Sequence, residues 1–311
     1  MAQEPGASRS KIKRKPRMNP VEVRRRALAT AEQMVLTDGL MVSMDHISLE
    51  EIIVRAQVSR SAVHRMWPRK EDFFADLLVQ LADRSDVSPS VFDPQSLAVA
   101  MAALRAQIDQ LVTPEGRLAV LVEICRQGAI RNFEANLIEE SWHAFVVLSA
   151  TGMSFDDEVR ATLGAKLAAS ERNYVDGMAQ FYSLLLPILG RRIRPQFGGQ
   201  ALNLPSDYLY LAEVCSSAIQ GQVLRAGITG GDLLPDLRMP TADADPFGTG
   251  LAKPWTGPAL TFTSTMVAMT EPIRDYVFDR DETERQVTVA IEYVENARTA
   301  RDSDGVEPVP E

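Results

Sequence analysis

The segment from residue 48 to residue 74, SLEEIIVRAQVSRSAVHRMWPRKEDFF, constrains the fold more than any other part of the chain. Ser48 and Glu51 have the spacing of a capping box, and the apolar residues that follow them predict a short helix. Ser59 is a suitable N-cap for a second short helix over residues 59–66, which Trp67-Pro68 closes. The sequence therefore predicts two short helices joined by a turn of about three residues.

Longer helices are predicted on both sides of this segment. Asn19-Pro20 is a good helix start, and apolar residues at three- and four-residue spacing continue to Asp38-Gly39. A further helix opens at Arg69-Lys70 and continues through Leu81. Residues 20–84 are thus expected to form a small helical domain.

Packing of the two short helices on each other decides which of their residues are buried. Ile52, Ala56 and Val63 should lie between the helices, with Val58 closing the turn against the core. The outward side of the second helix then carries polar residues, namely Arg60, Ser61, His64 and Arg65.

Charge is distributed unevenly along the chain. The net charge is −9, yet residues 1–84 hold 15 of the 33 Lys and Arg and 11 of the 42 Asp and Glu, a net of +4. The rest of the chain holds 18 and 31, a net of −13. A basic head on an acidic body is typical of a nucleic-acid-binding module joined to another domain. Residues 1–19 are either a solvated, disordered tail or an arm that follows DNA phosphates, and the two interpretations are compatible.

The segment from the first predicted helix to Leu81 resembles the DNA-binding domain of the TetR/AcrR family of bacterial regulators. The resemblance rests on the capped helix at Ser48, the turn Ala56-Gln57-Val58-Ser59, the recognition helix 60–66, Trp67, and the step Arg69-Lys70-Glu71-Asp72-Phe73. It covers about 60 residues. Gln57 stands where the family has a turn glycine, which implies a non-glycine residue at positive φ. His64 replaces a usual tyrosine and Met66 a frequent histidine.

The resemblance implies contacts to double-stranded DNA from seven residues: Ser48, Ser59, Arg60, Ser61, His64, Arg65 and Lys70. Arginine can pair with guanine through two hydrogen bonds, and helix starts and lysines suit phosphates. Trp67 is expected in the core. Arg24, Arg25 and Arg26 either lie near the DNA backbone or solvate the first helix.

The remainder of the chain is also predicted to be helical, so the expected fold class is all-α. After a linker at 85–94, a domain over residues 95–301 is expected, with a polar tail at 302–311. Gly and Pro make up eleven of the residues 226–258, which predicts a break in the helices. The expected helices cover residues 95–112, 115–131, 133–150, 155–189, 206–227, 259–278 and 282–300.

By resemblance, this larger domain would hold a small-molecule effector and the dimer contact. The helices at 206–227 and 282–300 would pair with a second copy, although their apolar residues could equally form the chain's own core. An insertion at 228–280 could cover the pocket, extend the dimer contact or be disordered. The candidate pocket residues, each of which could also be ordinary core, are Trp142, His143, Phe145, Met153, Tyr174, Met178, Phe181 and Tyr182.

These observations predict a ligand-responsive transcriptional regulator. A repressor that binds a palindromic operator as a homodimer, and that a small apolar effector releases, is expected; an activator or a ligand-independent DNA-binding protein is the alternative. We expect no enzyme activity, cofactor or metal site, because no catalytic motif is present and Cys125 and Cys215 lie far apart. No secretory signal or membrane span is expected either, which favours the cytoplasm.

Overall fold

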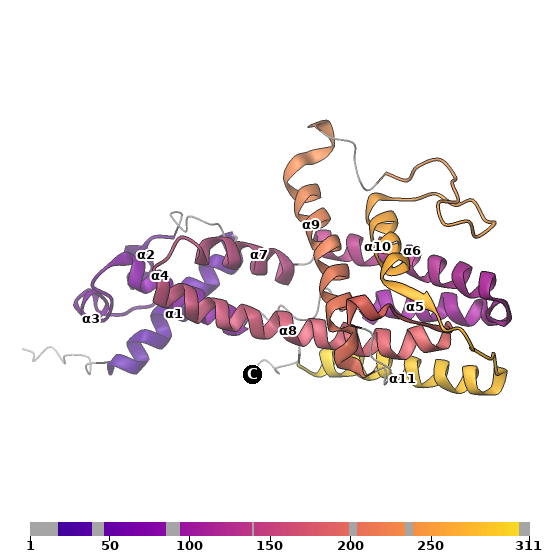
Figure 1. Cartoon of the computed structure of the whole chain (residues 1–311). Coiled ribbons are helices and arrows are strands. Elements are labelled where there is room, and N and C mark those ends of the chain that lie inside the picture. Colours follow the sequence, from indigo (N-terminus) through magenta and orange to yellow (C-terminus); the bar gives the residue numbers. More distant parts are fainter. Residues whose placement is uncertain are drawn as a thin grey trace, which may run out of the picture. The chain divides into compact units, whose positions relative to one another are not determined.

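The computed structural model describes residues 18–38, 47–84, 94–138, 140–198, 204–233 and 239–304, and most of these are helical (Figure 1). The mostly helical fold class that the sequence predicts is confirmed. The predicted arm, up to residue 17, and most of the predicted linker lie outside the described residues. The chain divides into two compact units, residues 1–84 with 150–163, and residues 85–149 with 164–311. Each is described by itself.

The first unit contains four of the expected helices: α1 (Pro20–Asp38), α2 (Leu49–Arg55), α3 (Arg60–Met66) and α4 (Lys70–Arg84). Helix α1 begins as predicted, because the Asn19 side-chain oxygen accepts a hydrogen bond from the Glu22 amide at 2.7 Å. The apolar stripe of α1, which includes Ala27 and Leu28, is buried. These helices surround one small apolar core.

Polar contacts at the edge of this core join α1 to α4. The indole nitrogen of buried Trp67 donates to the Asp76 carboxylate at 2.8 Å, and Arg24 lies 3.2 Å from the same carboxylate. Further along, Gln80 donates to Glu32 at 2.8 Å. The prediction that Trp67 belongs to the core is confirmed, and its one polar atom is satisfied at the edge.

Seven more α-helices are described in the rest of the chain, two of which, α7 and α8, have residues in both units (Figure 1). They are α5 (Pro94–Ala106), α6 (Pro114–Ile138), α7 (Glu140–Gly152), α8 (Asp157–Ile188), α9 (Leu209–Leu233), α10 (Gly257–Met269) and α11 (Arg280–Asp304). Short 3-10 helices cover Ile108–Val112, Pro195–Phe197 and Pro205–Tyr208.

Several predicted boundaries are wrong. The helix expected at 95–112 changes to a 3-10 helix after Gln107, and α9 continues to Leu233 through glycines that were expected to end it. The helix expected at 259–278 ends at Met269, because Thr270–Pro272 forms strand β2, which pairs antiparallel with β1 (Arg191–Ile193). Helix α11 extends to Asp304, into the predicted tail.

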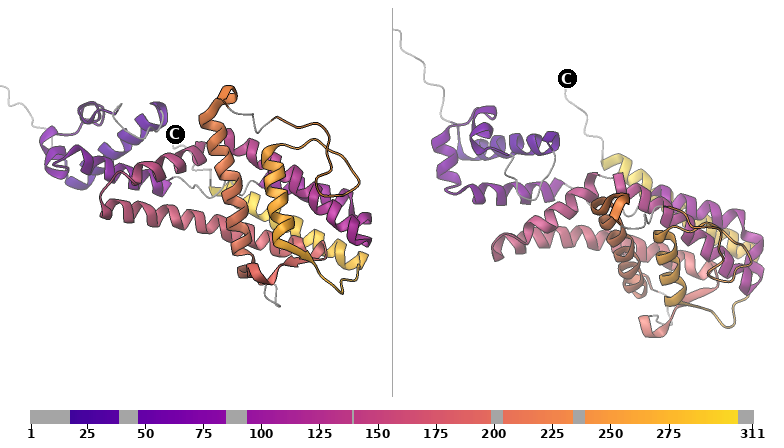
Figure 2. Two further views of the ribbon diagram at one scale, coloured as in Figure 1. Left: turned by 45° about the horizontal axis from the view of Figure 1, so that its top comes forward. Right: turned by 90° about the horizontal axis from the view of Figure 1, so that it is seen from above.

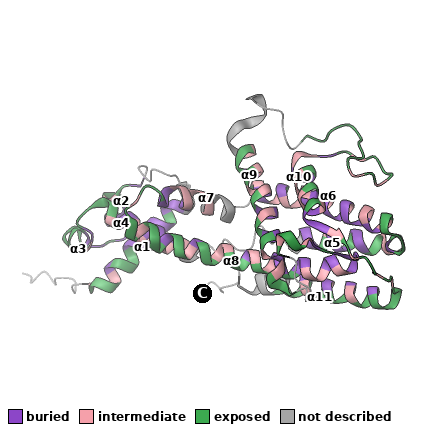
Figure 3. Cartoon of the chain, in the orientation of Figure 1, coloured by how far each residue is buried: buried purple, intermediate pink, exposed green. Residues whose placement is uncertain are grey.

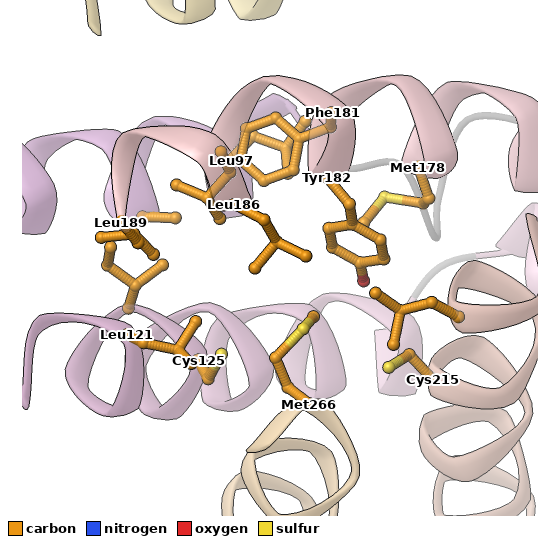
Figure 4. Packing of buried hydrophobic residues seen from close by; sticks show 14 of the residues in the cluster. Leu97, Leu121, Cys125, Met178, Phe181, Tyr182, Leu186, Leu189, Cys215 and Met266 are labelled. Carbon is orange, nitrogen blue, oxygen red and sulfur yellow. The ribbon is translucent and has the colours of Figure 1, made fainter. Parts of the chain in front are cut away.

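The second unit is built on one large apolar cluster. Helices α5, α6, α8, α9, α10 and α11 all contribute to it, and Figure 4 shows part of this packing. Helices α9 and α10 lie side by side in the views of Figure 1 and Figure 2 and contact each other. Among the described residues, no helix is long and apolar enough to cross a membrane.

The region predicted as an insertion packs on this unit through a second, smaller apolar cluster. Trp255 is buried with Ala259 against Val122 of α6, and its indole nitrogen donates to the Ala244 carbonyl at 3.1 Å. Asp245 organises the preceding loop by accepting hydrogen bonds from the amides of Thr249 and Gly250. Residues 239–280 therefore form an ordered segment that packs on the domain.

Candidate functional site

The turn between α2 and α3 has the left-handed residue that the sequence predicts. The Ala56 amide donates to the Ile52 carbonyl at 2.8 Å, and the Val58 amide reaches back to the Ile53 carbonyl at 3.2 Å. Between them, Gln57 has φ of 54°, the only positive φ of a non-glycine residue in the described chain. The positive φ expected at this position is confirmed.

Replacing Gln57 by glycine should therefore raise the free energy of unfolding by about 0.5–1 kcal/mol. Left-handed backbone is strained in residues with a Cβ, and removing that strain outweighs the extra freedom of glycine in the unfolded chain. Gln57→Ala is the matched control, because it keeps the Cβ, and its unfolding free energy should stay close to that of the parent. Urea unfolding measures all three; a less stable Gln57→Gly variant would contradict the expectation.

Buried residues on α2, the turn and α3 fix the short helix α3 in place. Ile52, Ala56, Val58 and Val63 are all buried, as predicted, and α1 contacts both α2 and α3. The Ser48 hydroxyl caps α2 by accepting from the Glu51 amide at 3.4 Å, while the Glu51 carboxylate lies 2.5 Å from Arg55. Only the Ser48 half of the predicted capping box is therefore formed.

The opposite side of α3 is polar and exposed. Arg60, Ser61, His64 and Arg65 are all exposed, as predicted, and their spacing places them along one side of the helix (Figure 3). Ser59 precedes them as the N-cap residue, but its hydroxyl lies 2.9 Å from the Ser61 hydroxyl and does not cap the helix. The sequence thus identified five neighbouring polar residues on one exposed surface.

The other two predicted contact residues begin neighbouring helices. Ser48 is the N-cap of α2, and Lys70 is the first residue of α4. The Lys70 ammonium lies 5.1 Å from the centre of the Phe74 ring, which supports its position. Both residues are exposed. We call Ser48, Ser59, Arg60, Ser61, His64, Arg65 and Lys70 the α3 surface.

Glu50 is a member of this neighbourhood that the sequence analysis missed. Its carboxylate lies 2.8 Å from the Arg60 guanidinium and 3.8 Å from Nε2 of His64. The sequence shows only that Glu50 is an acidic residue in the first turn of α2. It does not show which residues of α3 would contact the Glu50 carboxylate. Glu50 partly offsets the positive charge of the α3 surface.

The arginines of α1 are engaged within the chain. Arg25 and Arg26 both contact the Glu22 carboxylate, at 2.8 and 2.6 Å, and their hydrogen bonds lower the pKa of Glu22 to about 2. Arg24 contacts Asp76. These contacts favour the interpretation in which the three arginines solvate and stabilise α1.

A second candidate site is a cavity of about 60 Å³ inside the second unit. Tyr174, Met178, Phe181 and Tyr182 of α8 line it, and the sequence analysis proposed all four. Phe145 is half-buried on α7 and is not part of the lining, and Met153 is 70% exposed. Phe145 and Met153 therefore do not line this cavity. The side chains of Trp142 and His143 are outside the part of the chain that the structure describes.

Most of the lining consists of residues that were not among the pocket candidates named from the sequence. These residues are Ser96, Leu97 and Ala100 of α5, Ile124, Cys125, Gly128, Ala129 and Asn132 of α6, Leu185 of α8, Cys215, Ser216 and Ile219 of α9, and Phe262 and Met266 of α10. None of the described lining residues carries a charged side chain. Met266 and Cys215 are visible at this site in Figure 4.

The two cysteines of the cavity should react very slowly with thiol reagents. Burial raises the pKa of the Cys125 thiol to about 12 and that of Cys215 further still, so at mildly alkaline pH almost no thiolate is present. Native protein should show little reaction with an aromatic disulfide reagent. In concentrated guanidinium chloride each chain should displace two equivalents of the reagent's aromatic thiolate, because it has two cysteines. Rapid labelling of native protein would contradict this, and Cys125→Ala would show which thiol reacts.

Neither site can be assigned by likeness to known proteins. The chain matches no model of a protein family, no curated protein and no solved structure. Within the described residues, no group of three or more His, Cys, Asp or Glu side chains is placed to hold a metal ion.

Proposed function

We propose that residues 47–84 form a helix-turn-helix and that α3 is its DNA-recognition helix. The observation that carries this proposal is the two-sidedness of α3: Val63 anchors one side in the core, while Arg60, Ser61, His64 and Arg65 project from the other. A single short helix with one anchored and one polar side can enter the major groove, which is about 12 Å wide.

The side chains of the α3 surface suit both kinds of DNA contact. Arginine side chains can donate two hydrogen bonds to one guanine, and serine and histidine can reach base edges or phosphates. Ser48 and Lys70, at the starts of α2 and α4, would contact phosphates on either side. From Ile47 to Lys70 there are five Lys and Arg and two Asp and Glu, so this stretch attracts the DNA backbone.

The whole chain is proposed to be a TetR/AcrR-type repressor that binds a palindromic operator as a homodimer. Two recognition helices read more base pairs than one, which multiplies specificity. The cavity would hold the effector. An effector releases DNA only if it binds the DNA-free conformation more tightly, because ligands shift an equilibrium by their difference in affinity.

The proposed dimer contact differs from the pair of helices named from the sequence. Val287, Ala290 and Val294 of α11 are buried in the chain's own core, and Val289 is the one large apolar residue that α11 exposes among the described residues. Helix α10 instead lies beside α9, and the two helices expose large apolar residues: Tyr210 and Leu224 on α9 and Leu260 on α10. We therefore place the second copy on α9 and α10.

Binding to DNA upstream of the protein's own gene tests this function. Purified protein should bind one fragment specifically in a fluorescence anisotropy assay, leave a two-fold symmetric footprint, and lose affinity steeply as salt rises, because binding releases counterions. Light scattering should give the mass of two chains. Equal affinity for all fragments at moderate salt, or a monomer that binds DNA without dimerising, would contradict the proposal.

Replacing Glu50 by glutamine should tighten DNA binding about 2- to 10-fold. The change removes a negative charge next to the proposed phosphate path and frees Arg60 from an exposed ion pair that contributes little to stability. Glu51→Gln is the matched control, because Glu51 pairs with Arg55 on α2 and not with α3. Anisotropy titrations measure both variants. Equal tightening by both would show a general effect of charge, and no effect of Glu50→Gln would show that this pair does not compete with DNA.

A further inference from the structure

The hydroxyl of Tyr182 is one of the polar groups in the cavity wall. Tyr182 is only 3% exposed, and its hydroxyl has no hydrogen bond to any residue that the structure describes. Figure 4 shows its ring leaving α8, with the hydroxyl pointing across the cluster towards the side where Cys215 lies. A buried hydroxyl without a partner is costly, because it has given up its hydrogen bonds to water.

The neighbouring tyrosine shows that the fold is able to satisfy such a group. Tyr174 lines the same cavity about two turns earlier on α8, and a hydrogen bond with the Ser216 side chain of α9 lowers its pKa against the rise that burial causes. Both rings are buried, so the two tyrosines differ in the hydroxyl partner and not in their degree of burial. The free hydroxyl of Tyr182 is therefore a donor that faces the cavity.

The remaining lining determines the charge of a suitable ligand. Burial raises the pKa of Tyr182 well above its ordinary value, so the hydroxyl keeps its proton and donates. No charged side chain lines the cavity among the described residues, so a charged ligand would lose its hydration without gaining a counter-ion. The lining thus selects for an uncharged molecule.

The volume and the lining determine its size and polarity. A cavity of about 60 Å³ corresponds to the space of about four to six waters, which is close to the volume of a single-ring compound. Eight of the eighteen lining residues are Leu, Ile, Phe or Met, and the flexible side chains of Met178 and Met266 can adjust to a ring. One hydrogen-bond acceptor on that ring would match the hydroxyl of Tyr182.

We propose that this cavity binds a small, uncharged ring compound that is apolar except for one hydrogen-bond acceptor, which receives the hydroxyl hydrogen of Tyr182. That this compound acts as an effector rests on the proposed function; that it binds does not.

Three probes of similar size test the ligand class on the full-length protein without DNA. Acetophenone carries a carbonyl acceptor, α-methylstyrene replaces that oxygen by a methylene group, and benzoate carries a charge. Binding is followed by calorimetry and by thermal shift. Tyr182→Phe and Tyr174→Phe are the matched variants, because each removes one hydroxyl from the cavity wall and keeps the ring.

Acetophenone is expected to bind more tightly than α-methylstyrene, and benzoate not at all. Tyr182→Phe should weaken acetophenone about 3- to 10-fold, the loss of one neutral hydrogen bond, and leave α-methylstyrene unchanged or tighter. Tyr174→Phe should leave this preference for the carbonyl in place. Without ligand, Tyr182→Phe should melt at the same temperature as the parent or higher, since no protein hydrogen bond is lost.

Four results would overturn the proposal. They are saturable binding of benzoate, equal weakening of both neutral probes in Tyr182→Phe, loss of the carbonyl preference in Tyr174→Phe alone, and the absence of acetophenone binding up to its solubility. Because none of these measurements contains DNA, a failure here leaves the DNA-binding proposal standing. A failure to bind DNA likewise leaves the ligand result intact.

Discussion

Replacing both Arg60 and Arg65 by alanine is expected to lower the affinity for operator DNA about 30-fold or more. Each arginine contact to a base is worth about 1–3 kcal/mol, and a factor of ten in affinity corresponds to about 1.4 kcal/mol. Both side chains are exposed, so the substitutions should leave the folded domain intact. The loss should be larger for the operator than for unrelated DNA, because base contacts act on specific binding.

The matched control removes the same charge elsewhere. Arg192 and Arg285 are exposed in the second unit, where they pair with Glu271 and Glu282. Arg192→Ala combined with Arg285→Ala changes the net charge equally and should alter affinity less than about 3-fold. Anisotropy titrations over a series of salt concentrations separate the two cases. If both double variants lost affinity equally for every DNA, α3 would not be the recognition helix.

The α2–turn–α3 arrangement could be predicted because its signals are local. Ser48 caps its own helix, Gln57 takes the conformation of its own turn, and the spacing of Ile52 and Val63 determines which sides are buried. Each of these depends on neighbours a few residues away. Side-chain exposure on a short helix then follows from its geometry.

The cavity and the charge balance around α3 depend on contacts between distant segments, which a single sequence does not reveal. Five helices line the cavity, and only the residues of α8 had been proposed correctly. Glu50 and Arg60 are ten residues apart and meet because α2 and α3 pack at a particular register. Strands β1 and β2 are three residues each and 79 positions apart, too short to show alternation. Tertiary packing also overrides local preference where α9 continues through its glycines.

Replacing Phe73 by alanine is expected to destabilise the first unit by about 3–5 kcal/mol, the usual cost of truncating a fully buried phenylalanine. Its ring is 0% exposed and packs edge-to-face on Trp67, with the ring centres 4.9 Å apart. Trp67 in turn donates to Asp76, which Arg24 of α1 also contacts. The empty space left by the missing ring would therefore destabilise α1, α4 and the C-terminal end of α3, where Trp67 lies.

Hydrogen exchange locates this effect within the chain, because exchange through local opening reports the free energy of each cooperative region. Peptides from α1 and α4 should exchange at least about 100-fold faster in Phe73→Ala, the factor that corresponds to about 3 kcal/mol, whereas peptides from α6 and α10 should be unchanged. Val54→Ala, at a side chain 74% exposed on α2, is the control and should match the parent. Equal acceleration of exchange in α6 would mean that the two units unfold together. No acceleration in α1 would mean that Phe73 does not stabilise the apolar core on which α1 and α3 pack.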